Sequence, residues 1–249
     1  MSNIFKKSYK IKFYETDFTQ KIKTHSIINY MQETSSLHSE ILGDGYEALG
    51  KKGMYWVVSR IKLDMIKYPK WNEEITIETW PSGLDRMFFL RAFRIYGENN
   101  EHMGDIDAAY LLIDKKSPLP YKPKEEDIPY EVIKDRFKQY KRINKIRFNK
   151  DEGELIGKRK VRYNDIDLNK HVNNAKYVEW VEDCFKTEDF KEKRISSIQV
   201  NFIKEAKEGQ KILFYKYDVK EEKNSYYIQG KDKETDVELF QAKISFKNM

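Results

Sequence analysis

A chain of 249 residues is long enough for one large domain or for two domains of ordinary size. Hydrophobic residues make up 39% of it and supply a core, yet no run of about twenty apolar residues occurs, so no stable membrane insertion is expected. The formal charge of +6 comes from basic residues that alternate with acidic ones, without a helix-turn-helix, zinc-finger or RNA-binding motif. This argues against a nucleic-acid partner and leaves an ordinary solvated surface, an acidic protein or an anionic substrate.

The start of the chain and its thiol and imidazole content limit the class further. The first residues, MSNIFKKSYKIKF, lack an apolar stretch of signal-peptide length, which favours a cytoplasmic location. A single Cys excludes an internal disulfide and a Cys-based zinc cluster, and the four His residues show no metal-ligand spacing. We therefore expect no metal and no cofactor.

In the first half of the chain, an extended segment leads into one amphipathic helix and then into strands. Thr24 is the candidate N-cap of this helix and Gly43 the candidate C-cap. Its apolar stripe consists of Ile27, Ile28, Met31, Leu37, Ile41 and Leu42. Alternating apolar residues then predict strands with one buried face, at Ile75 and Ile77, at Phe93 and Ile95, and at Ala109, Leu111 and Ile113.

The middle of the chain, residues 114–157, carries four Pro and many charges. It is too long for a bare turn, and we interpret it as a crossing linker with one short helix near residues 130–140. The predicted domains are an N-terminal unit over residues 1–130 and a C-terminal unit over residues 158–249.

The second half opens with the segment DIDLNKHVNNAKYVEWVED, residues 165–183. Asp167, Asn169 and His171 alternate, so an extended segment sends their side chains to one side, and the Asn residues that follow are typical of a helix start. Polar groups gathered at a helix N-terminus indicate a reaction site. The ordinary alternatives are a turn closed by Asp167 and Asn169 and a structural His171.

The second predicted helix and the strands after it repeat the pattern of the first half. The helix stripe consists of Tyr177, Val178, Trp180, Val181, Cys184 and Phe185. Alternation then predicts strands at Leu213, Tyr215, Tyr217 and Val219, and at Phe240, Ala242, Ile244 and Phe246.

An internal repeat explains this likeness. Without gaps, residues 12–33 match 162–183, residues 66–75 match 203–212, and residues 97–113 match 230–246, in the same order. Each match is weak alone, but their common order indicates two copies of one unit. One helix on an antiparallel sheet, present twice, gives an α+β fold that resembles the double hotdog architecture.

Several motifs place the chain more closely. The run D-x-N-x-H-V-N-N-x-K-Y, from Asp167 to Tyr177, resembles the signature of acyl-acyl carrier protein thioesterases of bacteria and plastids. YETD at 14–17, WVVSRI at 56–61, KYPKW at 67–71 and AAYLLID at 108–114 resemble further stretches of that family. The resemblance implies a hydrolase that cleaves fatty acyl-acyl carrier protein, with acyl carrier protein as its partner.

The resemblance also implies a catalytic carboxylate. The family has a segment similar to R-R-E-C after the second helix, and here Lys204-Glu205-Ala206 occupies that place, so Glu205 matches the Glu. The neighbouring Cys is Ala206 in this chain, and Cys184 belongs to the helix stripe, which makes a covalent Cys mechanism improbable. The ordinary alternative for Glu205 is an exposed salt-bridging residue.

The chemistry of thioester hydrolysis assigns the expected roles. Glu205 is the general base, His171 and Asn169 hold the attacking water, and Asp167 orients Asn169 or sets the polarity of the loop. The backbone N–H groups of Val172 and Asn173 face the developing oxyanion at the helix N-terminus.

Two further roles are predicted from the surface and from the repeat. Lys158, Arg159, Lys160 and Arg162 are candidates for docking the acidic carrier protein. In the first copy, Thr19, Lys21 and Tyr68 replace Asn169, His171 and Glu205, so this unit is expected to be catalytically silent. The family resemblance implies that this unit completes the sheet and forms the acyl-chain pocket.

In that first unit, Met31, Met54, Trp56 and Phe88 could line the acyl-chain pocket, although such an apolar stripe is more often ordinary core. His25, His38 and His102 have no sequence partner that indicates chemistry.

Other functions remain open on sequence alone. The same chemistry could act on acyl-coenzyme A, and a hotdog protein could bind acyl thioesters without cleaving them. Hotdog dehydratases use a His with a carboxylate but resemble this motif less well. The two fused units could pair inside one chain, or two chains could form a homodimer.

Overall fold

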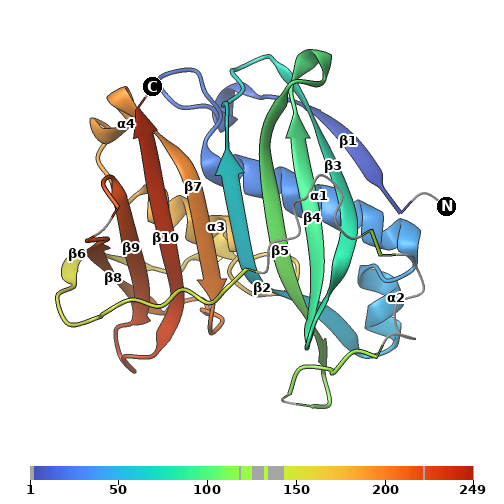
Figure 1. Cartoon of the computed structure of the whole chain (residues 1–249). Coiled ribbons are helices and arrows are strands. Elements are labelled where there is room, and N and C mark those ends of the chain that lie inside the picture. Colours follow the sequence, from blue (N-terminus) through green and yellow to red (C-terminus); the bar gives the residue numbers. More distant parts are fainter. Residues whose placement is uncertain (1–2, 118, 125–131, 134–142, 221, 249) are drawn as a thin grey trace. The chain divides into compact units, whose positions relative to one another are not determined.

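The computed structural model describes residues 3–117, 119–124, 132–133, 143–220 and 222–248 (Figure 1). The chain divides into two compact units, residues 1–143 and 144–249. In each unit a helix packs against an antiparallel sheet, so the predicted α+β class is confirmed. The short helix predicted near residues 130–140 falls, except for residues 132–133, outside the described residues.

The first unit contains the strands β1 (Phe5–Lys10), β2 (Met54–Met65), β3 (Glu74–Asp85), β4 (Phe88–Tyr96) and β5 (His102–Asp114). Their order across the sheet is β1-β3-β4-β5-β2, and every neighbouring pair is antiparallel. Helix α1 (Thr24–Leu42) crosses one face of this sheet, and α2 (Tyr46–Lys51) follows it. The 3₁₀ turns η1 (Phe13–Glu15) and η2 (Glu98–Asn100) lie in the connections.

Helix α1 confirms one predicted cap and corrects the other. Gly43 ends the helix with φ of 82°, a left-handed conformation that glycine adopts without strain. The N-cap is Lys23, and Thr24 is the first helical residue. The hydroxyl of Thr24 lies 3.3 Å from the hydroxyl of Tyr68, so it bonds to another element of the fold and does not cap the helix.

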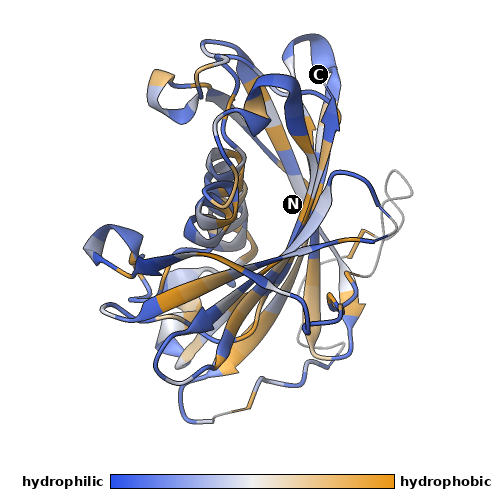
Figure 2. Ribbon diagram, turned by 90° about the vertical axis from the view of Figure 1, so that its left-hand side faces the viewer, coloured by the Kyte–Doolittle hydropathy of each residue, from blue (hydrophilic) through white to orange (hydrophobic). Residues whose placement is uncertain are grey.

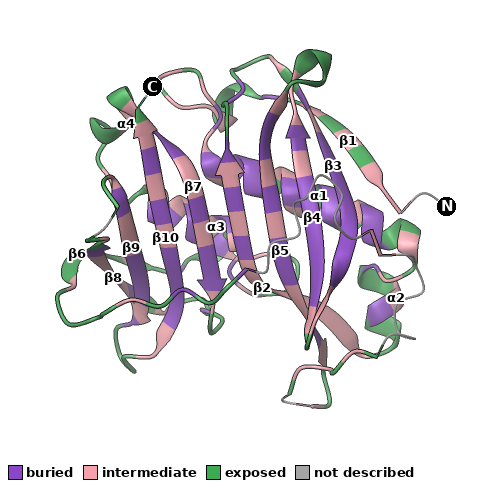
Figure 3. Cartoon of the chain, viewed as in Figure 1, coloured by how far each residue is buried: buried purple, intermediate pink, exposed green. Residues whose placement is uncertain are grey.

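Helix α1 has a buried face, drawn purple in Figure 3, and this face changes from apolar to polar along the helix. Ile27, Ile28 and Met31 are fully buried, as predicted. Ile41 is instead 49% exposed, so the predicted apolar stripe is wrong at this position. The second half of the buried face is polar and consists of Thr34, Ser35, His38 and Ser39.

The second unit contains β6 (Glu154–Lys160), β7 (Lys193–Phe202), β8 (Lys211–Asp218), β9 (Ser225–Asp232) and β10 (Glu238–Asn248). Their order is β7-β10-β9-β8-β6, again antiparallel throughout. Strand β6 begins inside the segment that we expected to be linker. The helices are α3 (Asn174–Glu182) and α4 (Asp189–Glu192), with the 3₁₀ turn η5 (Tyr163–Asp165) before α3.

Aromatic side chains fix α3 on its sheet. The ring of Tyr177 lies 5.4 Å from that of Phe202 and 5.3 Å from that of Phe240, and Trp180 lies 6.3 Å from Phe214. The helix ends at Glu182, before Cys184. Coloured by hydropathy, the strands mix hydrophobic and hydrophilic residues along their length, as sheets with one buried face do (Figure 2). Among the described residues, no helix combines the length and apolarity that a membrane crossing requires.

Matching backbone bonds support the first two repeat matches. Ile11 N–H donates to Glu73 O at 2.9 Å in the first unit, and Val161 N–H donates to Gln210 O at 2.9 Å in the second. The residues Gln20 and Lys170 both have φ of 64° at the same point of the loop before the helix.

The third repeat match, of residues 97–113 with 230–246, differs by three residues from the correspondence that the structure shows. The N–H groups of Ile66 and Ile203 donate to Met103 O and Leu239 O, so Met103 corresponds to Leu239 and not to Asp236. The match placed Gly97 opposite Gly230, but Gly97 follows β4, whereas Gly230 lies within β9.

Candidate active site

The segment from Asp165 to Asn173 forms a tight loop between η5 and α3. Ile166 and Val172 form an antiparallel bridge, and Asp167 N–H donates to His171 O at 2.8 Å. Lys170 takes the left-handed conformation at the turn of this loop. The backbone thereby fixes the positions from which the side chains of Asn169 and His171 extend.

The carboxylate of Asp167 closes the loop from inside. Its Oδ1 accepts from the N–H of Asn169 at 2.8 Å and from the N–H of His171 at 3.3 Å. In the first unit, Oδ1 of Asp17 accepts from Thr19 N–H at 2.8 Å in the same way. Since the same bond exists where no His follows, the geometry favours the turn-closing alternative for Asp167.

His171 and Glu205 meet although they come from different segments. His171 Nε2 lies 3.0 Å from Glu205 Oε2, and their side chains are 31% and 41% exposed. A His and a carboxylate within hydrogen-bond reach, both accessible to water, can accept and return a proton. This contact separates Glu205 from an ordinary surface Glu that pairs with a neighbouring Lys.

Asn169 is exposed and lies two residues before His171 in the same loop. Among the residues that the structure describes, none forms a hydrogen bond with its side-chain amide. The amide therefore has the capacity to bind a water molecule or a substrate oxygen.

Tyr177 contributes a contact that sequence reasoning missed. Its hydroxyl accepts from the N–H of Ala206 at 3.1 Å and so ties the segment of Glu205 to α3. Burial raises the pKa of Tyr177 to about 12, and the nearby carboxylates of Glu205 and Asp167 add to the increase, so the hydroxyl stays protonated. Tyr177 was included in the apolar stripe, and only its place at the end of the motif hinted at a polar role.

The helix start corrects one of the two expected oxyanion donors. Asn173 N–H donates to Asp165 O at 2.9 Å, so it is already used, and the Asn173 side chain caps α3 by accepting from Ala175 N–H at 2.8 Å. In the first unit, Ile22 N–H donates to Pro69 O at 3.0 Å. For the matching N–H of Val172, no acceptor is found within the described part of the chain, which leaves it available as a donor.

Cys184 is a poor nucleophile in this setting. Its thiol donates to Trp180 O at 3.2 Å, and burial raises its pKa to about 12. The thiolate, which is the reactive form of cysteine, is therefore scarce at neutral pH.

Of the four basic residues predicted to dock a partner, one is paired with carboxylates of its own unit. The guanidinium of Arg159 lies within 3.2 Å of Asp183 and 3.6 Å of Asp165 and stacks over Trp180 at 5.3 Å. These contacts occupy it within the chain. Lys158, Lys160 and Arg162 are exposed.

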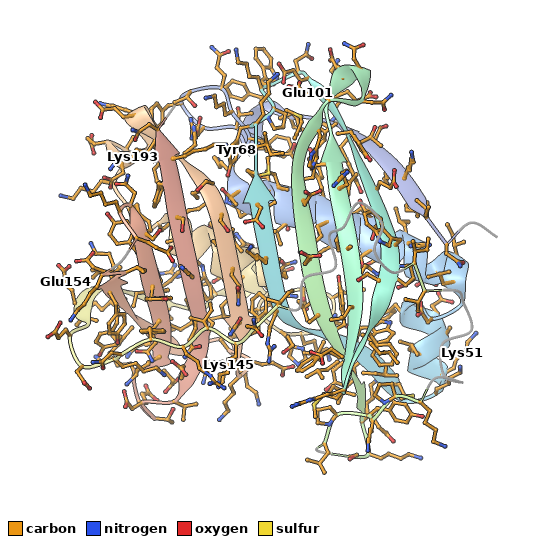
Figure 4. All side chains as sticks on the ribbon, viewed as in Figure 1. Lys51, Tyr68, Glu101, Lys145, Glu154 and Lys193 are labelled. Atoms are coloured by element: carbon orange, nitrogen blue, oxygen red, sulfur yellow. The ribbon has the colours of Figure 1, made fainter. Side chains whose placement is uncertain are left out.

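The first unit lacks the chemistry at the matching positions. Tyr68, labelled in Figure 4 in the segment after β2, stands where the second unit has Glu205, and it is buried against Thr24. Thr19 and Lys21 replace Asn169 and His171. The first unit thus keeps the loop and lacks the His–Glu pair.

Two family models match the chain. The model of the acyl-ACP thioesterase N-terminal domain matches residues 2–131, and that of the acyl-ACP thioesterase C-terminal domain matches residues 148–248. His171 and Glu205 both lie in the second matched range.

Curated relatives are similar at lower identity. A chloroplastic acyl-[acyl-carrier-protein] hydrolase of Cuphea viscosissima is 27% identical over 223 residues, which cover 82% of this chain and 52% of the relative. The chloroplastic dodecanoyl-[acyl-carrier-protein] hydrolase of Umbellularia californica is 27% identical over 222 residues, which cover 81% and 56%. The chain spans about half the length of these relatives.

Solved structures share the fold over nearly the whole chain. An acyl-ACP thioesterase from Bacteroides thetaiotaomicron superposes with a TM-score of 0.87 at 20% identity, covering 99% of this chain and 100% of the other. The 12:0-ACP thioesterase from Umbellularia californica gives a TM-score of 0.83 at 22% identity, covering 100% and 99%. At such identities the likeness shows the fold alone, and it confirms the double hotdog class.

Proposed function

Because this chain belongs to the acyl-acyl carrier protein thioesterase family, we propose that it hydrolyses the thioester of a fatty acyl-acyl carrier protein. The products are a free fatty acid and the carrier-protein thiol. The observation that carries the proposal is the contact of 3.0 Å between His171 and Glu205, inside the part of the chain that matches the C-terminal family model.

In the proposed mechanism, Glu205 takes a proton from a water molecule that His171 and Asn169 hold beside the thioester. The water oxygen attacks the carbonyl carbon, and the oxyanion that develops receives a hydrogen bond from Val172 N–H. Collapse of the tetrahedral intermediate breaks the carbon–sulfur bond, and the proton held by Glu205 returns to the leaving sulfur. Asp167 and Tyr177 act by positioning His171 and Glu205.

Two features favour water over a cysteine as the nucleophile. Ala206 stands next to the proposed base, and the buried thiol of Cys184 has its pKa raised to about 12. Glu205 and His171 are both exposed enough for water to reach them.

The proposed partner is acyl carrier protein, which is acidic and would approach the exposed, positively charged side chains of Lys158, Lys160 and Arg162. We leave Arg159 out of this docking surface because its guanidinium contacts carboxylates of the chain itself. The first unit, whose copy of the site has no base, would hold the acyl chain, as the family resemblance implies. The cytoplasmic location, the boundaries of the two domains and a pairing of two chains stay predictions.

The test compares thiol release from matched acyl carrier protein and coenzyme A thioesters, using wild type, Glu205→Gln and Glu208→Gln. Removal of a general base lowers kcat by about 10²–10⁴-fold, so Glu205→Gln should lose at least a hundredfold. Glu208→Gln changes an exposed carboxylate of the same segment and should keep full activity.

Three outcomes would change the proposal. Faster release from coenzyme A would keep the chemistry and replace the partner. Equal loss in both variants would remove Glu205 from the role of base. Binding of the thioesters by wild type without any thiol release would make the chain an acyl-binding protein.

A further inference from the structure

One charged residue interrupts the apolar face that β4 turns toward α1. Alternate residues of this strand, Phe89, Phe93 and Ile95, are buried, and Arg91 stands among them with 7% of its surface exposed. A guanidinium in such a place is costly unless charged or polar partners surround it. The groups around Arg91 must therefore compensate its charge, or the folded chain carries the cost.

The partners of Arg91 are all neutral. Its guanidinium donates to His38 Nδ1 at 2.8 Å and to Ser39 Oγ at 3.4 Å, both on α1. Within the described residues, no carboxylate forms an ion pair with Arg91. Charged donors of this kind normally meet carboxylate or another strong oxygen acceptor.

His38 adds a second donor with nothing to bind. Its Nδ1 accepts from Arg91, so the ring proton of the neutral imidazole sits on Nε2. Burial, together with the charge of Arg91, lowers the pKa of His38 to about 4, so the ring is neutral near pH 7. The residue is 1% exposed, and in the part of the chain that is described Nε2 has no hydrogen-bond partner.

The surroundings of this polar pair are mixed. Ser35 Oγ lies 3.2 Å from the hydroxyl of Tyr110, which gives two further groups that can donate or accept. Next to them lies an apolar cluster of Leu49, Phe89 and Leu112, against which Tyr110 also packs. A ligand that suits both parts is an apolar chain with an oxygen acceptor on it.

We propose that the interior of the first unit selects an acyl chain that carries an oxygen acceptor, namely a hydroxyl, oxo or carboxylate group, which binds Arg91 and the Nε2–H of His38. The inference rests on the proposed function, which assigns the acyl chain to this unit. It deepens that function by naming the class of acyl group. The apolar cluster holds the methylene part, and the two donors bind the oxygen.

Binding of acids in ester form tests this without catalysis. Methyl esters of plain fatty acids, methyl esters of ω-hydroxy fatty acids and monomethyl esters of α,ω-dicarboxylic acids, of matched even chain lengths from octanoic to hexadecanoic, are titrated into wild type, Arg91→Met and His38→Phe. The ester masks the head carboxylate, so the plain acid carries no further oxygen group on its chain. A hydrogen bond to a charged group corresponds to about tenfold or more in affinity. We expect wild type to bind an oxygenated acid at least tenfold more tightly than the plain acid for at least one length, and Arg91→Met to lose this preference.

The second variant and a stability measurement protect the result from a folding artefact. His38→Phe keeps an aromatic ring on Phe5, whose own ring lies 5.6 Å from that of His38, and it should weaken the preference while leaving Arg91 in place. The thermal unfolding midpoint, Tm, of Arg91→Met should be equal to or higher than that of wild type, because an uncompensated buried charge is removed. A preference for the plain acid at every length, or an equal change for all acids in both variants, would overturn the proposal.

Thioester hydrolysis then separates this inference from the proposed function. Release of thiol from plain acyl thioesters with no preference among acids would remove the inference and keep the hydrolase. A preference among the esterified acids without hydrolysis of any thioester would remove the hydrolase and keep the acceptor-binding interior.

Discussion

The carboxylates of Asp17 and Asp167 accept the same backbone hydrogen bond in two matching loops. Of these two loops, the second contains His171, which contacts Glu205. The two Asp residues form a matched pair for separating loop stability from catalysis. We expect Asp17→Ala and Asp167→Ala each to lower the free energy of unfolding by about 1 kcal/mol, as loss of a hydrogen bond does. Only Asp167→Ala should also lower kcat, since it frees the backbone that carries His171.

Urea unfolding measures the first effect, and thioester hydrolysis under saturating substrate measures the second. An equal fall of kcat in the two variants would contradict a positioning role for Asp167. Retention of full activity by Asp167→Ala would show that the loop holds His171 without this carboxylate.

His38 makes stability depend on pH. Its pKa is lowered from 6.5 to about 4 in the folded chain, so below pH 6.5 the unfolded chain binds a proton that the folded chain does not. This contribution to stability is therefore present above pH 6.5 and is lost as the pH falls toward 4. Each unit of pKa difference corresponds to about 1.4 kcal/mol, so the loss amounts to a few kcal/mol.

Urea unfolding at a series of pH values, with wild type and His38→Phe, checks this prediction. The variant should show a smaller fall in the free energy of unfolding across that window. Parallel pH profiles for the two proteins would mean that other groups cause the acid sensitivity.

At the scale of elements, two glycines differ in whether their backbone conformation requires a glycine. Gly43 ends α1 with φ of 82°, where any other residue is strained, whereas Gly50 lies inside α2. Neither has an atom within 4 Å of the place that a Cβ would take, so a clash does not decide the outcome. Gly43→Ala should cost about 1–2 kcal/mol, and Gly50→Ala should be neutral or stabilise by about 0.5–1 kcal/mol.

Thermal and urea unfolding of the two single variants provide the comparison. A loss of stability in both would indicate that Gly50 also has a backbone requirement. No loss in Gly43→Ala would mean that the end of α1 tolerates a shift of the last turn.

At the scale of the whole molecule, the net charge of +6 gives a field that attracts an acidic partner over long distances. We expect the double variant Lys158→Glu/Lys160→Glu to raise KM for acyl carrier protein thioesters several-fold and to leave kcat unchanged, because docking is affected and the chemistry is not. Added salt should raise the wild-type KM for the carrier protein in the same direction.

The control is Lys51→Glu at the end of α2 in the first unit, labelled in Figure 4, which changes the net charge at a residue that is not part of the proposed docking surface. Coenzyme A thioesters provide a second control, since they lack the acidic protein. Equal effects of the Lys51 variant and of the double variant, after allowing for charge, would move the docking surface elsewhere.

The sequence alone determined the two-copy organisation, the α+β class and the family, because hydrophobic periodicity and short motifs are local properties. It also brought His171 and Glu205 into one hypothesis, but only through the resemblance to the family. The residues between them do not by themselves predict that the two side chains meet. Sequence failed where a side chain has a choice of partners. Thr24 bonds to Tyr68 and leaves the cap to Lys23, and Arg159 turns to carboxylates of its own unit.

Only the tertiary structure decided which polar groups are used and which remain available. Asn173 N–H is used by Asp165, while Val172 N–H is not bonded within the described residues, and this difference depends on how the loop folds back on η5. The residues considered as pocket lining also separate: Met54 and Trp56 pack against the cluster that contains Leu112, whereas Phe88 packs against a second cluster of Leu90, Ala109 and Ile143. The physical reason is that hydrogen-bond satisfaction and burial depend on contacts between segments distant in sequence, as the meeting of Arg91 on β4 with His38 on α1 illustrates.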